Sequence, residues 1–385
     1  MHEIYEPAED SFLLQKHIKD YAKGLTLDMG TGAGIQAIEA AKYAKKVIAV
    51  DLNPAAIKNA KKAAKGIKNI KFIKSDLFAK IKGKFDCIIF NPPYLPSEKN
   101  AIPDIALDSG THGFEIIIKF LEESVRHLKD DGKILLLFSS LSKPEVILKK
   151  AEELLLDYKL IDQQHIFFED LFVYEFRKSA LLLEFESKKV FDAREFTHGK
   201  HGKIYTGAYK GKKVAIKTAL TPQFETHIQN EAIMLKRINK LGIGPKLLFS
   251  TDAYFAYTFI EGKFILGFLE KAKASQIKKL IKEILMQCRI LDKRGLSKFE
   301  MTKPVKHIIV QKNGKAVMID FERCKHTKKP KNVTQFCQFI ISPQVNQILA
   351  KLGININQEK LIEACKEYKR NPIQKKFVFI EEIVC

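Results

Sequence analysis

The sequence lacks several features that would assign it to a particular class of protein. No apolar run approaches the roughly 20 residues that a membrane-spanning helix needs, and the polar, acidic start does not have the pattern of a signal peptide. The 6 cysteines are scattered without a Cys-x-x-Cys spacing, so neither a zinc site nor a disulfide framework is indicated. These absences predict a protein of the reducing cytoplasm, without contact to a membrane.

Acidic residues are scarce in only one half of the chain. Residues 1–178 hold 27 Lys and Arg against 26 Asp and Glu, whereas residues 179–385 hold 39 against 19. Since 385 residues exceed what one core usually fills, we expect two domains, with the change in charge marking the second. A basic domain of this size indicates ribosomal RNA, the ribosome or another polyanion as a partner. A lysine-rich solubilising surface, from a genome that favours lysine, is the alternative.

Apolar strands alternate with helical patterns from residue 25 to about residue 177. The alternation predicts an α/β fold with a doubly wound, mostly parallel sheet of the Rossmann-like kind. No helical pattern separates the last two strands, so we expect them to form an antiparallel hairpin at the edge of the sheet. The expected strands are 25–29, 46–50, 69–73, 85–90, 133–138, 159–166 and 171–176, and the expected helices are 34–43, 54–65, 113–128 and 144–156.

A glycine-rich turn follows the first expected strand. Three glycines within residues 28–34 let the backbone turn sharply and approach a ligand closely at the start of a helix, which makes Asp28, Gly30 and Gly32 candidates for cofactor binding. Asp51 closes the second strand, where a carboxylate can hold ribose hydroxyls. Asp76 ends the third strand and can meet an adenine amine. A dinucleotide and S-adenosylmethionine both suit this pattern.

The tetrapeptide Asn91-Pro92-Pro93-Tyr94 follows the buried strand 85–90. Its two prolines end the hydrogen-bonded ladder and stiffen the backbone at the carboxyl end of a strand, where open α/β sheets bind their ligands. The Asn91 side chain and the Pro92 carbonyl can accept the two hydrogens of a planar NH2 group, while Tyr94 covers its flat face. Methylation of an amide or an exocyclic amine needs such a clamp, and this favours S-adenosylmethionine as the cofactor.

With these motifs, residues 1–178 resemble the class I methyltransferases of the HemK-like protein-glutamine N5 group. Residues 5–14 resemble the opening motif of the archaeal and eukaryotic branch, which modifies the glutamine of the GGQ loop in class 1 release factors and so acts in translation termination. The resemblance implies S-adenosylmethionine as the cofactor and a small zinc-bearing activator subunit as a partner. It implies catalytic roles for Asn91, Pro92 and Tyr94 and a cofactor site made of Glu9, Asp28, Gly30, Gly32, Asp51, Asp76 and Asn91.

Two other substrates remain open for this half. The same tetrapeptide occurs in adenine-N6 methyltransferases of DNA and RNA, because an adenine amine is planar like a primary amide. Those enzymes usually carry a target-recognition segment, and residues 95–178 contain no recognisable insertion of that kind. A different protein side chain is the other possibility.

The second half contains two alternating strands around a short turn, and the second strand ends in Val-Ala-Ile-Lys217. A lysine in this position binds nucleotide phosphates in protein kinases, and Gly199 and Gly202 stand where a shortened glycine loop would cover them. Glu231, in the helix that follows, can pair with Lys217. Asp320 lies in Met-Ile-Asp-Phe-Glu, which matches the metal-binding segment of kinases and makes Asp320 a candidate magnesium ligand.

Residues of about 190–345 thus resemble an atypical, RIO-like archaeal serine/threonine kinase, in a second domain of 182–385. The resemblance implies ATP and Mg²⁺ as ligands. Glu300 stands at the position of the catalytic base in place of Asp, His307 is the nearest candidate for the missing metal-binding Asn, and Glu322 replaces the usual glycine. An active kinase, an ATP-binding regulatory pseudokinase and a structural or RNA-binding domain all remain open. Residues 179–187 can pair with either sheet, and the tail from residue 335 has a helical and then a strand-like pattern.

Overall fold

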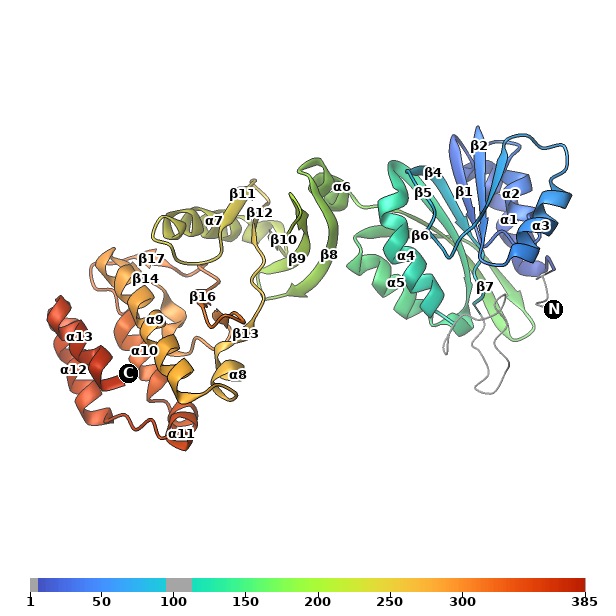
Figure 1. Ribbon diagram of the computed structural model, residues 1–385. Helices are drawn as coiled ribbons and strands as arrows, with labels where there is room; N and C mark the ends of the chain where they lie inside the picture. The colour runs from blue at the N-terminus through green and yellow to red at the C-terminus, as the bar shows by residue number, and fades with distance from the viewer. Residues whose placement is uncertain (1–5, 95–112, 385) are drawn as a thin grey trace. The chain divides into compact units, whose positions relative to one another are not determined.

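The computed structural model describes residues 6–94 and 113–384 (Figure 1). The chain divides into two compact units, one made of residues 1–196 and 207–210 and the other of residues 197–206 and 211–385. The domain boundary that the sequence analysis placed at residues 178–182 therefore lies inside the first unit. None of the helices in the described part of the chain combines the length and the hydropathy of a membrane span.

The first unit is built on a seven-stranded sheet with the order β3-β2-β1-β4-β5-β7-β6. Strands β1 to β5 pair in parallel, and β6 and β7 form an antiparallel hairpin at one edge. Both features confirm the expected α/β sheet. The strands are β1 (Leu25–Met29), β2 (Lys46–Asp51), β3 (Ile70–Lys74), β4 (Phe85–Phe90), β5 (Leu128–Ser139), β6 (Leu156–Ile166) and β7 (Glu169–Lys178).

Helices cover both faces of this sheet because its central strands are apolar on both sides. On β4, Cys87 and Ile89 belong to a core shared with helices α1 and α2, while Phe90 packs on Phe120 of α4 with ring centroids 4.5 Å apart. The alternation follows from the two-residue repeat of a strand. The helices are α1 (Glu9–Tyr21), α2 (Ile35–Ala40), α3 (Pro54–Ala63), α4 (Glu115–His127), α5 (Pro144–Glu153) and α6 (Ala180–Ser187), with the short 3-10 turn η1 (Ser140–Ser142).

Residues 179–187 form helix α6, so the expectation that this segment pairs with a sheet is wrong. Ser179 caps the helix, because its side chain accepts a hydrogen bond from the backbone N–H of Leu182 at 3.2 Å. Leu182 and Phe185 are fully buried. Glu186 accepts a hydrogen bond from Lys178, whose side chain is fully buried, with Nζ and Oε2 2.7 Å apart. The helix thus belongs to the first unit.

A second sheet follows α6 along the chain, and a mostly helical part follows that sheet. The five-stranded sheet has the order β11-β12-β10-β9-β8 and carries helix α7. Its elements are β8 (Val190–His198), β9 (Gly202–Tyr209), β10 (Lys212–Ala219), η2 (Pro222–Phe224), α7 (Glu225–Asn239), β11 (Leu247–Ser250) and β12 (Tyr254–Thr258). Gly202 is required at the start of β9, because a Cβ there would lie 2.5 Å from the carbonyl oxygen of Thr218.

In the helical part, α10 and α13 pack on the long helix α9. Its helices are α8 (Ile265–Leu269), α9 (Ala274–Lys293), α10 (Asn332–Ile340), α11 (Pro343–Lys351), α12 (Gln358–Arg370) and α13 (Gln374–Val384), and its short elements are β13 (Lys263–Phe264), β14 (Leu296–Ser297), η3 (Phe299–Thr302), β15 (Ile308–Val310), β16 (Ala316–Met318) and β17 (Lys325–His326). The strand-like end expected for the tail is wrong, because α13 is a helix that buries Phe377, Ile380 and Val384. These positions recur at helical spacing.

Candidate functional site

A cavity of about 250 Å³ lies at the carboxyl ends of strands β1, β2 and β4. Strand β1 is paired with β2 on one side and with β4 on the other, so the chain order reverses here. Open α/β sheets bind ligands at such a switch point. The lining includes residues from the turn after β1, from the ends of β2 to β4 and from the start of helix α1, among them Asp10, Ser11, Gly30, Thr31, Gly32, Asp51, Asn53, Asp76, Leu77, Asn91, Pro92, Pro93 and Tyr94.

The turn between β1 and α2 needs its glycines. Gly30 and Gly34 have φ angles of 63° and 90°, in the left-handed region that side chains disfavour. A Cβ on Gly30 would lie 3.1 Å from the ring of Phe90, and one on Gly34 would lie 3.0 Å from the Cβ of Ala60. The turn is therefore pressed against β4 and α3, and its backbone forms one wall of the cavity.

Asp28 is hydrogen-bonded to this turn and does not line the cavity. Its carboxylate accepts a hydrogen bond from the Thr31 hydroxyl at 2.6 Å, and its side chain is buried. Burial raises the pKa of Asp28 to about 7, although the bond from Thr31 opposes the rise. Asp28, which was expected to bind the cofactor, thus contacts the turn itself and is not among the lining residues.

Asp51 lines the cavity at the end of β2. Its two carboxylate oxygens accept hydrogen bonds from the backbone N–H of Gly32 at 2.9 Å and of Asn53 at 2.8 Å. Burial raises the pKa of Asp51, and these N–H groups oppose the rise. Asp76 also lines the cavity, but it is exposed and pairs with Lys119 at 3.2 Å. Each carboxylate oxygen can accept a further hydrogen bond, as a ribose or a base amine would require.

Asn91 is fixed in the cavity through one end of its amide. The amide nitrogen donates to Oδ2 of Asp10 at 2.9 Å and lies 3.5 Å from the Ser11 hydroxyl. The amide oxygen is buried, and it has no hydrogen-bond partner among the described residues. Pro92 and Tyr94 line the same cavity, and the backbone oxygen of Tyr94 accepts from the Ser142 hydroxyl at 3.0 Å. The clamp expected for this tetrapeptide therefore has a free buried acceptor at its centre.

Glu9 is exposed and is not among the lining residues, whereas its neighbour Asp10 is buried and touches Asn91. The structure thus places Asp10 in the cavity wall beside Asn91, and a role of Glu9 in cofactor binding stays a prediction. The signal for Asp10 was present in the helical repeat, because Asp10 shares one face of α1 with Leu13 and Leu14, which are buried in the core.

The second unit brings together the charged residues that the sequence analysis singled out there. Lys217, on β10, lies 2.6 Å from Oε2 of Glu231 on α7 and 3.5 Å from Oδ1 of Asp320. The other oxygen of Glu231 accepts a hydrogen bond from the backbone N–H of Phe321 at 3.0 Å. Asp320 has a φ angle of 62°, an unusual value for a residue with a side chain. Lys217, Glu231 and Asp320 thus form one connected cluster.

Glu300 and His307 lie at the same cluster, on the side of Asp320. Nδ1 of His307 is 3.4 Å from Oδ2 of Asp320. Glu300 is reached through Lys298, whose Nζ lies 3.4 Å from its carboxylate and donates to the backbone oxygen of Asp320. Lys298 is fully buried and lies over the ring of Phe321 at 4.9 Å. Sequence reasoning missed Lys298, because a lysine two positions before Glu300 carries no sign that it is buried.

Electrostatic coupling keeps this cluster charged. Burial by itself would lower the pKa of Lys217, but the carboxylates of Glu231 and Asp320 raise it. Burial would raise the pKa of Asp320, but the facing cations Lys217 and Lys298 lower it. Burial, and then Lys298, lower the pKa of the His307 imidazole. The cluster therefore presents an ionised aspartate beside two lysines and a neutral histidine at pH 7.

Known proteins resemble the first unit in sequence. The family model of the methyltransferase small domain matches residues 8–165. A putative protein N5-glutamine methyltransferase of Methanocaldococcus jannaschii is 41% identical over 177 residues, which are 44% of this chain and 90% of that protein. The release factor glutamine methyltransferase of Lactococcus lactis is 36% identical over 136 residues, which are 32% of this chain and 50% of that protein. The chain thus spans about half the length of this bacterial relative.

A solved structure also resembles this part of the chain. It is the E. cuniculi Mtq2–Trm112 complex, described as responsible for the methylation of the eRF1 translation termination factor. The matched chain is 25% identical, with a TM-score of 0.38, and the match covers 46% of this chain and 98% of that one.

Proposed function

Because the chain belongs, through its first unit, to the family of protein N5-glutamine methyltransferases, we propose that the cavity methylates the side-chain nitrogen of a protein glutamine. The observation that carries the proposal is the buried amide oxygen of Asn91, which accepts no hydrogen bond from any residue that the structure describes. A buried acceptor without a donor is costly, and the NH2 group of a substrate amide would supply the donor. S-adenosylmethionine would supply an electrophilic methyl group.

The residues of the cavity suit this cofactor. The glycine turn and Asp51 offer a backbone wall and a carboxylate for the ribose, and Asp76 offers an acceptor for the adenine amine. Asn91 and the Pro92 carbonyl would orient the glutamine amide, whose nitrogen is a poor nucleophile because its lone pair is delocalised. Holding that nitrogen in position is therefore the main catalytic contribution expected of the protein. Tyr94 would cover the flat face of the amide.

The substrate that we propose is the glutamine of a translation release factor. The name of the L. lactis relative supports a release factor, and the opening motif at residues 5–14 supports the archaeal and eukaryotic kind. By the same resemblance, a small zinc-bearing activator subunit would assist the enzyme. The basic second half, with 39 Lys and Arg against 19 Asp and Glu, would contact ribosomal RNA.

A transfer assay with labelled S-adenosylmethionine tests the substrate class. Release factor, ribosomes and DNA are offered in parallel, at low and high salt and with and without the activator subunit. We expect label on a glutamine of the release factor. Label that appears only in DNA would overturn the protein substrate. Equal binding of the chain to ribosomes at both salt concentrations, measured by co-sedimentation, would contradict the contact with RNA.

We further propose that the second unit binds ATP with Mg²⁺ in the manner of an atypical serine/threonine kinase. The chain of contacts from Glu231 through Lys217 to Asp320 supports this, because kinases use such a lysine for the phosphates and such an aspartate for the metal. Glu300 would take the position of the catalytic base and His307 that of the second metal ligand. Both lie within the same cluster.

Nucleotide binding and transfer are separable in this unit. We expect Lys217→Met and Asp320→Asn to lose ATP binding, and Lys212→Met, on the same strand but exposed, to retain it. Autophosphorylation that depends on Glu300 would support a kinase. Binding of ATP without transfer would support the regulatory alternative, and unchanged binding in Lys217→Met would contradict both.

A further inference from the structure

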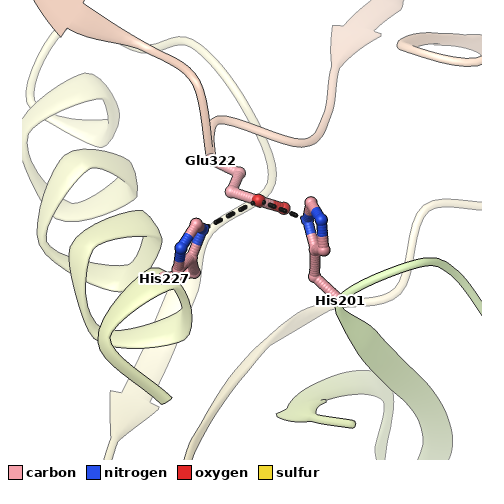
Figure 2. Close-up of side chains that lie close together, drawn as sticks. All are labelled: His201, His227 and Glu322. Atoms are coloured by element: carbon pink, nitrogen blue, oxygen red, sulfur yellow. Dashed lines mark hydrogen bonds and ion pairs between the residues drawn. The ribbon is translucent and has the colours of Figure 1, made fainter. Parts of the chain in front are cut away.

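Two histidines and a glutamate converge at one point of the second unit, outside the contacts used so far (Figure 2). His201 precedes strand β9, His227 lies in the first turn of helix α7, and Glu322 follows Phe321 after β16. Nδ1 of His201 is 2.7 Å from Oε1 of Glu322, and Nδ1 of His227 is 3.2 Å from the same oxygen. One ligand atom from each side chain lies within 4.8 Å of the other two.

This donor set suits a transition metal better than magnesium. Two imidazole nitrogens and one carboxylate oxygen are the ligands of open zinc sites, whereas Mg²⁺ prefers oxygen alone. Metal–ligand bonds of about 2.0–2.2 Å place neighbouring ligand atoms roughly 3.3–3.5 Å apart at a tetrahedral centre. The two distances from the histidines to Oε1 of Glu322, 2.7 and 3.2 Å, are shorter than this. A small outward shift of the carboxylate would therefore admit an ion.

The backbone holds both histidines where they are. His227 is carried by a helix of 15 residues, and the carbonyl oxygen of His201 accepts from the backbone N–H of Leu220 at 2.9 Å. The Phe224 ring forms an apolar wall, with its centroid 4.7 Å from that of His201 and 5.9 Å from that of His227. The His227 side chain is 50% exposed, so the remaining coordination positions are open to solvent.

The two oxygens of Glu322 face different partners. Oε1 is shared by the two histidines, while Oε2 is 3.8 Å from Nζ of Lys217. Glu322 also belongs to a group of carboxylates with Glu231 and Asp320, but Lys217 already neutralises that side. Oε1 has no lysine or arginine among these contacts, so a bound ion would supply a fixed positive charge beside it.

We propose that His201, His227 and Glu322 bind one divalent transition-metal ion of the zinc type, with at least one position left for water or another ligand. The site would be separate from the Mg²⁺ site expected at Asp320. It uses the glutamate that replaces the usual glycine of the kinase segment, so it would be a property of this chain and not of kinases in general. It does not depend on phosphoryl transfer.

Titration of the chelator-treated full chain with Zn²⁺ or Co²⁺ alone tests the proposal. We expect one ion per chain, a Co²⁺ absorption spectrum without the intense thiolate band that cysteine ligands give, and no displacement by excess Mg²⁺. Since loss of an outer partner already weakens metal binding 10–100-fold, His201→Ala and His227→Ala should each weaken it by about 100-fold or more. His165→Ala, which removes an exposed histidine of the first unit, should leave it unchanged.

The Glu322→Gln variant distinguishes loss of a metal ligand from loss of the fold. It keeps the size of the side chain and one oxygen acceptor, so we expect native circular dichroism together with weakened Co²⁺ binding. Equal Co²⁺ affinity in the His201→Ala/His227→Ala double variant would overturn the proposal, because the ion would then be bound elsewhere. Failure of the wild-type chain to bind any ion at micromolar concentration would overturn it as well.

Discussion

The amide nitrogen of Asn91 is hydrogen-bonded within the protein, which leaves its amide oxygen to accept a hydrogen bond from the substrate. Asp10 and Ser11 lie on the nitrogen side, and the amide cannot turn over without losing its bond to the Asp10 carboxylate, which only accepts. At the scale of a single residue, recognition then depends on one buried acceptor with a fixed direction. A donor such as NH2 is accepted there, and a second acceptor would be rejected because both oxygens would be left unpaired.

Replacing Asn91 should therefore affect the chemical step more than cofactor binding. We expect Asn91→Ala to lower kcat for methyl transfer on the order of 100-fold or more, which is the usual cost of removing one fixed polar contact to the reacting group. Affinity for S-adenosylmethionine, measured by calorimetry, should fall by less than kcat does. Asn59→Ala, at an exposed position of α3, is the matched control. A variant with full activity would exclude Asn91 from the clamp.

Asp28 makes the stability of the first unit depend on pH. Its pKa is raised from 3.8 to about 7 in the folded state, so the folded state holds a proton that the unfolded state releases. The resulting stabilisation is complete below pH 3.8 and is lost as the pH rises to about 7. Between pH 5 and pH 8 the loss is about 3 kcal/mol, at 1.36 kcal/mol for each pH unit.

Asp28→Asn should remove the loss of stability that the wild type shows between pH 5 and pH 8, because Asn does not titrate. The Asn side chain keeps an oxygen that can accept the hydrogen bond from Thr31. We expect the free energy of unfolding of the variant, relative to wild type, to rise by about 3 kcal/mol from pH 5 to pH 8. Urea unfolding followed by circular dichroism measures it, in the transition that S-adenosylmethionine shifts. Asp157→Asn, at an exposed position, should show no such rise. Parallel pH profiles for Asp28→Asn and wild type would refute the assignment.

At the scale of elements, Asn332 ties helix α10 to helix α9 and to the segment that carries Lys298. Its side chain accepts from the backbone N–H of Lys298 at 2.7 Å and donates to Asp292 at 2.7 Å and to the carbonyl oxygen of Leu296 at 2.6 Å. All of these groups are buried. The amino end of one helix thereby sets the position of a residue that contacts Asp320.

Asn332→Ala should destabilise the second unit by about 3 kcal/mol or more, because it leaves at least two buried polar groups without partners. Urea unfolding gives the loss, and hydrogen exchange of the α10 amides shows whether that helix is released first. Asn346→Ala changes the same residue type in the neighbouring helix α11 and should cost less than 1 kcal/mol. Equal losses in the two variants would argue against a special role for Asn332.

Sequence pattern predicted the first sheet well and the short helices poorly. The seven strands have strong apolar runs, so their pattern fits few other elements. A strand followed by Gly-x-Gly-x-Gly indicates where the ligand site lies. Helix α6 was ambiguous because a run such as Ala-Leu-Leu-Leu fits a helix or a strand, and only the Ser179 cap distinguishes them. Asp10 and Lys298 were missed because burial of a charged side chain is decided by tertiary packing. The convergence of His201 with His227 and Glu322 is likewise invisible to local pattern.

At the scale of the whole molecule, the first unit extends past the last strand of its sheet. Lys178 is fully buried and pairs with Glu186 of α6 at 2.7 Å, and Leu182 and Phe185 are buried as well. A chain cut at residue 178 would lose these contacts. The change in charge along the sequence therefore marks the start of the second unit only approximately.

A fragment of residues 1–189 should accordingly be more stable than one of residues 1–178. Breaking a buried ion pair costs about 3–5 kcal/mol. The melting temperature of a domain of this size changes by roughly 2–4 °C for each kcal/mol of stability. We expect the melting temperature to differ by about 6 °C or more, with S-adenosylmethionine raising both. Glu186→Gln within the longer fragment isolates the ion pair. Equal melting temperatures for the two fragments would show that α6 is dispensable.

The hydrogen bond between Asn91 and Asp10 joins residues that are 81 positions apart. Because Asp10 lies in helix α1, the rate of methyl transfer should depend on whether α1 is packed against the sheet. We expect helix α1 to detach in a local opening while the sheet stays folded, since a single docked helix can open at lower free energy than the core of a sheet. Methyl transfer would then be lost at a lower urea concentration than the far-ultraviolet circular dichroism signal of the folded sheet. The interval between the two midpoints would measure the docking free energy of α1 directly.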